Sequence, residues 1–166
     1  MENATTIIIA DPGSVKDVEE GSLFMPKFDD KGLITAIAVD FKTNDILMVA
    51  HMNRDALIKS IETKQAWYWS RSRQSLWRKG ETSGQIQRIK EMRVDCDQDA
   101  LLLLVEVGGD GGCCHTGRKN CFYRRIDGID SDNRIKLNTI NPLGFIKRLR
   151  IKIRKDRRTI ALAKVP

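Results

Sequence analysis

The residues with the most evident chemistry lie in one stretch, from Asp95 to Arg125. This stretch contains all four cysteines of the chain and one of its two histidines, and it opens with three aspartates in the pattern D-C-D-Q-D. Thiolates and imidazoles are ligands that zinc prefers, whereas carboxylates suit magnesium or calcium. The stretch therefore predicts metal chemistry with two kinds of ligand.

The zinc-type donors are Cys96, Cys114 and Cys121, with His115 nearby. A catalytic zinc site keeps one position open for water, while a structural site fills all four positions with protein groups. The spacing is not that of a zinc finger, because no C-x-x-C pair is present. Ordinary buried cysteines are the simpler alternative, since free cysteine is among the most buried residue types. Disulfides are disfavoured because the chain shows no secretion signal.

The carboxylates of Asp95, Asp97 and Asp99 are oxygen ligands of the kind that Mg²⁺ binds. In an extended strand, residues two apart share a face, so we expect these three carboxylates on one side and Cys96 on the other. A calcium EF-hand is excluded, because Ala100 stands where its loop requires glycine and an apolar run follows. A solvated acidic turn without metal is the alternative.

The elements around this stretch indicate an α+β domain with a mostly antiparallel sheet and one main helix. Strands are expected at residues 33–41, 46–50, 66–70, 85–94 and 100–107. Asn53 is a good N-cap for a helix over residues 54–64. Trp67 and Trp69 share one face of their strand, where they either pack in the core or offer a surface for ring stacking.

Basic side chains gather around a glycine-bounded turn, Gly80 to Gly84. Backbone N–H groups in such turns, together with hydroxyls and guanidinium groups, suit phosphate. The turn is not a P-loop, because Lys79 precedes the glycine, and a solvated basic loop is the alternative. The candidate phosphate-binding residues are Arg71, Arg73, Arg78, Lys79, Thr82 and Ser83.

Six motifs in order, between about residues 32 and 126, carry a resemblance to a known family. They are M-N-R-D-A-L (Met52–Leu57), W-S-R-S-R (Trp69–Arg73), L-W-R-K-G-E-T-S-G (Leu76–Gly84), Q-R-I (Gln87–Ile89), D-C-D-Q-D-A-L-L-L (Asp95–Leu103) and C-H-T-G-R-K-N-C-F-Y-R (Cys114–Arg124). With these motifs the chain resembles the phosphoribosyl-AMP cyclohydrolases, histidine-biosynthesis enzymes that open the adenine ring of phosphoribosyl-AMP. It departs from many relatives at His51, where they have tyrosine.

The resemblance implies zinc held by Cys96, Cys114 and Cys121, and magnesium held by Asp95, Asp97 and Asp99. It also implies a homodimer in which both subunits build each metal site. The expected reaction is hydrolysis of the N1–C6 bond of 1-(5-phosphoribosyl)-AMP by zinc-activated water, the third step of L-histidine biosynthesis. His115 is the candidate general base, because an imidazole titrates in the required range. The alternative is a structural zinc module with a nucleic-acid-binding basic tail.

The charge of the chain is concentrated in its C-terminal part. Of the 29 Lys and Arg residues, eleven lie in residues 131–166 with only two Asp, so the other 130 residues carry a net charge of −2. We therefore expect an N-terminal segment (1–30), a cyclohydrolase domain (31–128) and a basic tail (129–166), with nucleic-acid binding confined to the tail. Residues 146–155 could add an edge strand or bind anionic partners. The chain shows no membrane span and no signal peptide, so a cytoplasmic location is expected.

Overall fold

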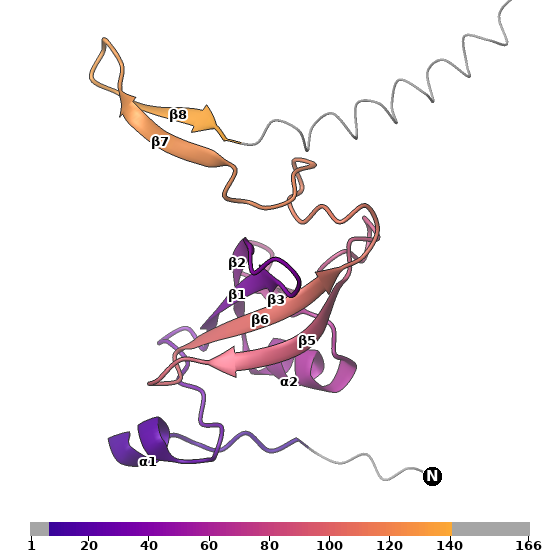
Figure 1. Ribbon diagram of the computed structural model, residues 1–166. Helices are drawn as coiled ribbons and strands as arrows, with labels where there is room; N and C mark the ends of the chain where they lie inside the picture. The colour runs from indigo at the N-terminus through magenta and orange to yellow at the C-terminus, as the bar shows by residue number, and fades with distance from the viewer. Residues whose placement is uncertain (1–6, 141–166) are drawn as a thin grey trace, which may run out of the picture. The chain divides into compact units, whose positions relative to one another are not determined.

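The computed structural model of the chain describes residues 7–140 and divides into two compact units, with the boundary between Gly111 and Gly112. In the described residues, the first unit holds a six-stranded sheet and two helices, and the second holds a two-stranded hairpin (Figure 1). All strand pairings in the large sheet are antiparallel except that of β1 with β6. The predicted α+β class with a mostly antiparallel sheet is confirmed.

The sheet of the first unit has the strand order β4-β3-β2-β1-β6-β5. The elements of this unit are α1 (Val15–Glu20), β1 (Ile34–Asp40), β2 (Ile46–Met52), α2 (Arg54–Thr63), β3 (Trp67–Ser70), β4 (Ser75–Arg78), β5 (Gln87–Val94) and β6 (Ala100–Val107). The five strands expected from the sequence are therefore present, with ends that differ by at most two residues. The helix α1 and the strand β4 were not expected.

The main helix, α2, fixes the position of β3. Asn53 caps its N-terminus by accepting a hydrogen bond from the Ala56 amide at 2.9 Å. Leu57 is fully buried, which stabilises the fold by about 2 kcal/mol. Ser60 is also fully buried, and its hydroxyl accepts a hydrogen bond from the Trp67 amide at 2.9 Å. Through these contacts α2 holds the aromatic strand against the core.

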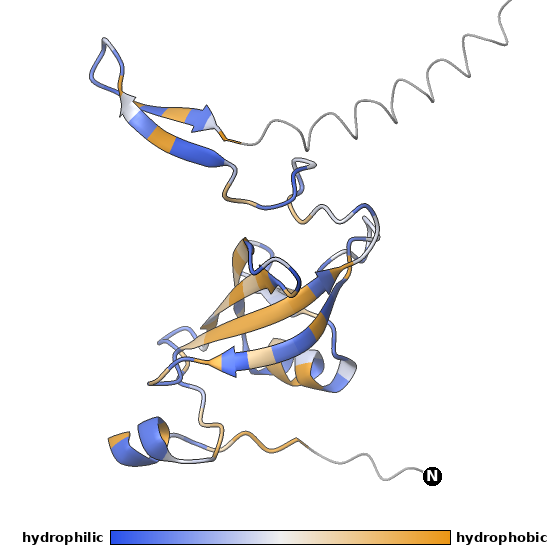
Figure 2. Cartoon of the chain, in the orientation of Figure 1, coloured by the Kyte–Doolittle hydropathy of each residue, from blue (hydrophilic) through white to orange (hydrophobic). Residues whose placement is uncertain are grey.

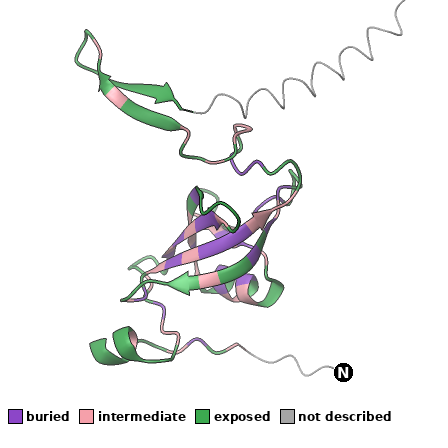
Figure 3. Cartoon of the chain, viewed as in Figure 1, coloured by how far each residue is buried: buried purple, intermediate pink, exposed green. Residues whose placement is uncertain are grey.

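The strand β6 lies between β1 and β5 and contributes a run of buried residues to the first unit's core. Leu101, Leu103 and Leu104 are at most 5% exposed, while Leu102 is half-buried. Burial on both faces explains why this strand is a continuous leucine run (Figure 3). The parallel pairing of β1 with β6 sets the two strands side by side, with Ile37 opposite Leu102.

The second unit contains the hairpin of β7 (Arg124–Ile129) and β8 (Ile135–Thr139). Its turn closes through the Asp130 amide, which donates to the Arg134 carbonyl at 2.8 Å. Ile126 faces Leu137 across the hairpin, and the hairpin is largely exposed (Figure 2 shows its alternating hydropathy). Residues on both sides of the expected boundary at 128 thus form one element. The expected edge strand at 146–155 lies outside the described residues. Neither helix described here has the length and apolar character needed to cross a membrane.

Candidate metal-binding residues and substrate cleft

The three aspartates lie in the turn between β5 and β6, so the expectation of an extended strand with alternating faces is wrong. The Gln98 amide donates to the Asp95 carbonyl at 3.3 Å, and the Asp95 amide donates to the Ala100 carbonyl at 3.1 Å. Gln98 has the left-handed φ of 60°, which reverses the chain. This turn brings the ligand atoms of Asp95, Asp97 and Asp99 within 4.8 Å of one another.

Charge repulsion within this cluster is visible at Asp99. The negative charge of Asp97 raises the pKa of Asp99 most, followed by burial and by the charge and hydrogen bond of Asp95, while Lys27 lowers it. The Lys27 ammonium lies 3.8 Å from the Asp97 carboxylate, and both side chains are exposed. A divalent cation would relieve the repulsion far better than one exposed lysine. The carboxylate set therefore fits a hard cation such as Mg²⁺.

Cys114 and Cys121 belong to the second unit, where a compact turn positions Cys114. The Cys113 and Cys114 amides donate to the Arg118 carbonyl at 3.2 and 3.0 Å, and the Gly117 amide donates to the Cys114 carbonyl at 3.0 Å. The Cys114 Sγ lies 3.0 Å from the hydroxyl oxygen of Thr116. The turn thus presents Cys114 on a locally rigid segment.

The Cys114 thiol is tuned toward its thiolate form. Burial raises its pKa, but hydrogen bonds with Thr116 and Cys121 and the charge of Arg118 together outweigh burial, so the pKa lies below its ordinary value. A thiolate is the form that binds zinc. The Cys114–Cys121 hydrogen bond also shows that the two predicted ligands lie side by side. They fit as two members of a zinc ligand set.

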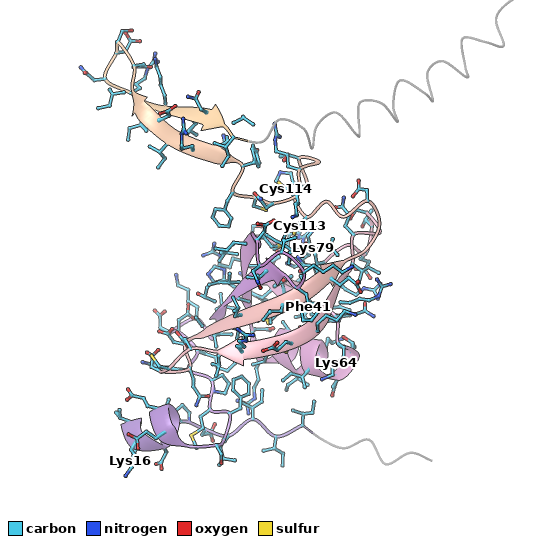
Figure 4. The ribbon with its side chains drawn as sticks, in the orientation of Figure 1. Lys16, Phe41, Lys64, Lys79, Cys113 and Cys114 are labelled. Carbon is cyan, nitrogen blue, oxygen red and sulfur yellow. The ribbon has the colours of Figure 1, made fainter. Side chains whose placement is uncertain are left out.

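The other predicted zinc-site residues differ in their surroundings. Cys96 stands in the first unit, on the loop of the three aspartates, and its side chain is exposed. Cys113 is as buried as its neighbour Cys114, and the two follow one another on the segment that leads to β7 (Figure 4). His115 is exposed directly beside Cys114. None of the four cysteines forms a disulfide in the described residues.

A cleft of about 410 Å³ lies in the first unit, at the end of β2 and beside the β3–β4 hairpin. Two tryptophans, Trp69 and Trp77, and two arginines, Arg71 and Arg73, line it together with His51. The Ser70 hydroxyl accepts hydrogen bonds from the Arg73 amide and Nε at 3.3 and 3.2 Å, which orients that guanidinium. Flat aromatic surfaces beside guanidinium groups suit a ligand that has both a planar ring and an anionic group.

The surroundings of His51 in this cleft favour its neutral form over its charged form. Burial lowers its pKa most, the positive charge of Arg71 lowers it further, and Asp29 opposes both. A neutral imidazole has one donor and one acceptor nitrogen, so it can accept a hydrogen bond from a ligand as well as donate one.

The expectation that the basic residues crowd around a single loop is wrong, because β4 separates them. β3 and β4 pair as a hairpin in which Trp67 faces Arg78 and Ser70 faces Ser75. Arg71 and Arg73 lie at its turn and line the cleft, whereas Arg78 and Lys79 lie at its opposite end. The Arg78 guanidinium stacks over the Trp67 ring at 5.7 Å. The six candidates therefore form two groups.

The second group adjoins the glycine turn that was expected to bind phosphate. Lys79 is largely buried, and Thr82 and Ser83 are exposed. The turn closes through the Gly84 amide, which donates to the Gly80 carbonyl at 2.8 Å. Substrate binding by all six residues stays a prediction.

Two cleft residues, His51 and Trp77, were not among the predicted site residues. The apolar pair Leu76-Trp77, which follows the aromatic strand after a short polar turn, is the available signal for β4, in which Trp77 pairs with Tyr68. His51 faces Trp69 across β2 and β3. That pairing has no signature in the sequence, because it depends on which strands become neighbours.

The fold and these residues define an α+β protein with one carboxylate and one thiol donor set and an arginine-lined aromatic cleft. A family model described as phosphoribosyl-AMP cyclohydrolase matches residues 48–123. The Brucella canis protein named phosphoribosyl-AMP cyclohydrolase is 54% identical over 136 residues, which cover 82% of this chain and 96% of that protein. Its namesake from Nitrobacter winogradskyi is 58% identical over 113 residues, covering 68% of this chain and 77% of that protein. The chain belongs to the phosphoribosyl-AMP cyclohydrolase family.

Proposed function

We propose that the chain hydrolyses the N1–C6 bond of 1-(5-phosphoribosyl)-AMP, the third step of L-histidine biosynthesis. The observation that carries this proposal is its similarity to proteins named for that activity over nearly their whole length, 96% of the Brucella canis protein. The matched region includes the aspartate loop and both vicinal cysteines. A cytoplasmic location, expected for such a biosynthetic enzyme, remains part of the same proposal.

Three thiols, those of Cys96, Cys114 and Cys121, would hold the zinc. The lowered pKa of Cys114 and its contact with Cys121 support this ligand set, because a thiolate is the form that binds zinc and the contact places a second sulfur beside it. Bound zinc supplies a water whose pKa is lowered to about 7, which makes it a nucleophile at neutral pH. The chain's part is to present these sulfurs and leave one ligand position open.

His115 is the proposed general base. It follows Cys114 directly and its side chain is exposed, so a substrate bound beside the sulfurs could reach its imidazole. A base there would take a proton from the attacking water and return it to the ring nitrogen as the C6–N1 bond breaks. His51 is not proposed for this role, because it lies in the arginine-lined cleft.

Asp95, Asp97 and Asp99 would hold magnesium. Their convergence within 4.8 Å and the raised pKa of Asp99 support this, because three neighbouring carboxylates need a compensating cation. Magnesium commonly binds through a few carboxylates together with waters or substrate phosphates. The role of these side chains is to fix a positive charge beside Cys96.

The substrate would be held by two groups of basic residues. In the cleft, Arg71 and Arg73 would bind one phosphate by paired hydrogen bonds, while Trp69 offers a ring surface. At the far end of the β3–β4 hairpin, Arg78, Lys79, Thr82 and Ser83 would contribute to binding the second phosphate. The separation of the two groups supports this division, since the substrate carries two phosphates at its two ends.

A homodimer would complete the site. The family resemblance supports a zinc site with ligands from two chains, and Cys96 belongs to a different compact unit from Cys114 and Cys121. The exposed apolar residues of the hairpin, such as Ile126 and Ile135, also support an association that covers them.

The experiment is to incubate the purified, zinc-loaded chain with phosphoribosyl-AMP and follow the ultraviolet absorbance of the ring. Ring opening should be accompanied by a product heavier by one water. A product that has lost ammonia instead would show deamination and contradict the proposal. A zinc-loaded protein without any turnover would favour a structural zinc module.

A further inference from the structure

We infer that Gln98 is a positioning residue that ties an N-terminal strap, residues 18–27, to the aspartate loop and so keeps the three carboxylates convergent. This inference rests on the proposed magnesium site. It concerns a side chain between two proposed ligands, Asp97 and Asp99, and a segment for which the family resemblance gave no role.

Gln98 differs from its neighbours in burial. The aspartates on either side face solvent wholly or in part, whereas Gln98 is 5% exposed. A buried amide must satisfy its hydrogen bonds, and this one does so with the strap. Its Oε1 accepts from the Met25 amide at 2.7 Å, and its Nε2 donates to the Val18 carbonyl at 2.8 Å and to the Leu23 carbonyl at 3.4 Å.

The backbone of Gln98 adds a fourth contact with the strap. Its carbonyl accepts a hydrogen bond from the Lys27 amide at 2.8 Å. The Lys27 side chain then reaches the Asp97 carboxylate at 3.8 Å. One residue thus joins the loop to the strap at several points that span ten residues of the strap.

The same residue forms the bend of the loop. Gln98 has φ 60°, a left-handed conformation that disfavours most side chains. Like charges on Asp95, Asp97 and Asp99, whose ligand atoms lie within 4.8 Å of one another, also oppose a closed loop. The hydrogen bonds to the strap therefore act against strain and repulsion, and without them the empty loop should open.

The strap braces the loop without covering it. A cleft of about 280 Å³ remains between the strap and the loop, and Asp95 and Cys96 line it along with Leu23 and Phe24. Asp95 thus stays accessible to a cation from this cleft, and Asp97 and Asp99 are at least partly exposed. Residues outside the ligand shell that orient ligands typically change metal affinity by about 10- to 100-fold when they are replaced.

The test uses the full-length, zinc-loaded protein and Mn²⁺, a spin probe that takes the same oxygen ligands as Mg²⁺. Glycine and asparagine both tolerate a left-handed backbone, but their side chains are too short to reach the strap. Gln98→Gly and Gln98→Asn should therefore remove the side-chain hydrogen bonds to the strap and keep the bend of the loop. Ser60→Ala is the matched control, since it also removes a buried polar group that bridges two segments, α2 and β3.

Electron paramagnetic resonance titration should show Mn²⁺ binding weakened about 10- to 100-fold in both Gln98 variants and unchanged in Ser60→Ala. Without Mn²⁺, the Met25 and Lys27 amides should exchange hydrogen faster in the Gln98 variants alone. Unchanged Mn²⁺ affinity in a folded Gln98 variant would overturn the positioning role, and unchanged exchange would overturn the tie. Wild-type protein whose Mn²⁺ binding is absent, or is unaffected by Asp97→Asn, would instead refute the magnesium site and with it the positioning role.

Discussion

The glycine turn at residues 80–84 allows a quantitative prediction, because its two end glycines share a left-handed backbone but differ in the space around them. Both have left-handed φ angles, 86° at Gly80 and 75° at Gly84. A Cβ atom added at Gly84 would meet no heavy atom within 4 Å. A Cβ atom added at Gly80 would lie 2.1 Å from the Gln85 carbonyl carbon and 2.2 Å from the Ile86 nitrogen.

These geometries give different costs. Gly84→Ala should lower the free energy of unfolding only by the left-handed penalty, about 1 to 2 kcal/mol. Gly80→Ala carries the same penalty and must also displace the backbone of residues 85 and 86, because no side chain can rotate away. That shift would strain two backbone hydrogen bonds of 2.8 Å. In one the Gly84 amide donates to the Gly80 carbonyl, and in the other the Gly108 amide donates to the Ile86 carbonyl. Their loss adds about 1 kcal/mol each, for a total of roughly 3 to 4 kcal/mol.

Urea unfolding followed by the fluorescence of the three tryptophans measures both values. The free energies of unfolding of the two variants should differ by about 2 kcal/mol, while the slope of that free energy against urea concentration stays unchanged. Gly80→Ala should also raise KM, because the displaced turn carries Thr82 and Ser83. Equal destabilisation of the two variants would show that Gly80 is not confined by its neighbours, and the explanation of this turn would be wrong.

The remaining predictions concern the metals, the cleft, the dimer and the tail. Cys114→Ser should abolish zinc binding and Cys113→Ser should keep it, as measured by metal content, and the reverse would reassign the ligand. The pKa of His51 in the folded protein lies below its ordinary value of 6.5. The fold therefore favours the neutral imidazole, and this contribution to stability is lost as pH falls from 6.5 through the lowered pKa. His51→Asn should therefore lose less stability than the wild type between about pH 7 and about pH 5. Urea unfolding that shows an equal loss of stability in both proteins over this range would contradict this. Mixed Cys96→Ser and Cys121→Ser proteins should regain activity, since one site of a mixed dimer keeps all its ligands; no recovery after proven subunit exchange would rule out shared sites. A chain ending after Ile140 keeps the whole β7–β8 hairpin and should open the ring at the full-length rate, and a soluble, zinc-loaded but inactive product would give the tail a role.

The sequence could predict elements where local patterns determine structure. Asn53 followed by helical spacing predicted α2, and the leucine run from Leu101 predicted a doubly buried strand. The parallel contact of β1 with β6 was beyond local patterns, since it joins residues more than sixty positions apart. Strand β4 was missed because it is only four residues long and carries the arginine that suggested a loop.

In the candidate site too, local sequence predicted some features, while others depend on contacts between distant residues. Residue types alone predicted that Asp95, Asp97 and Asp99 form a group, and they do. The proposed reason was wrong, because a left-handed turn at Gln98, and not strand alternation, makes them converge. Glutamine gives no local signal for such a turn. The hydrogen bonds that support it come from residues 18–27, far away in sequence.

The central claim is that three cysteines hold a zinc with one position left for catalysis, and X-ray absorption at the zinc edge tests it most directly. The spectrum of the zinc-loaded, full-length protein should show three sulfur donors at about 2.3 Å and one lighter donor at about 2.0 Å. Cys113→Ser should leave that spectrum unchanged. Four sulfur donors in the wild type, falling to three in Cys113→Ser, would show a closed structural site and contradict the account.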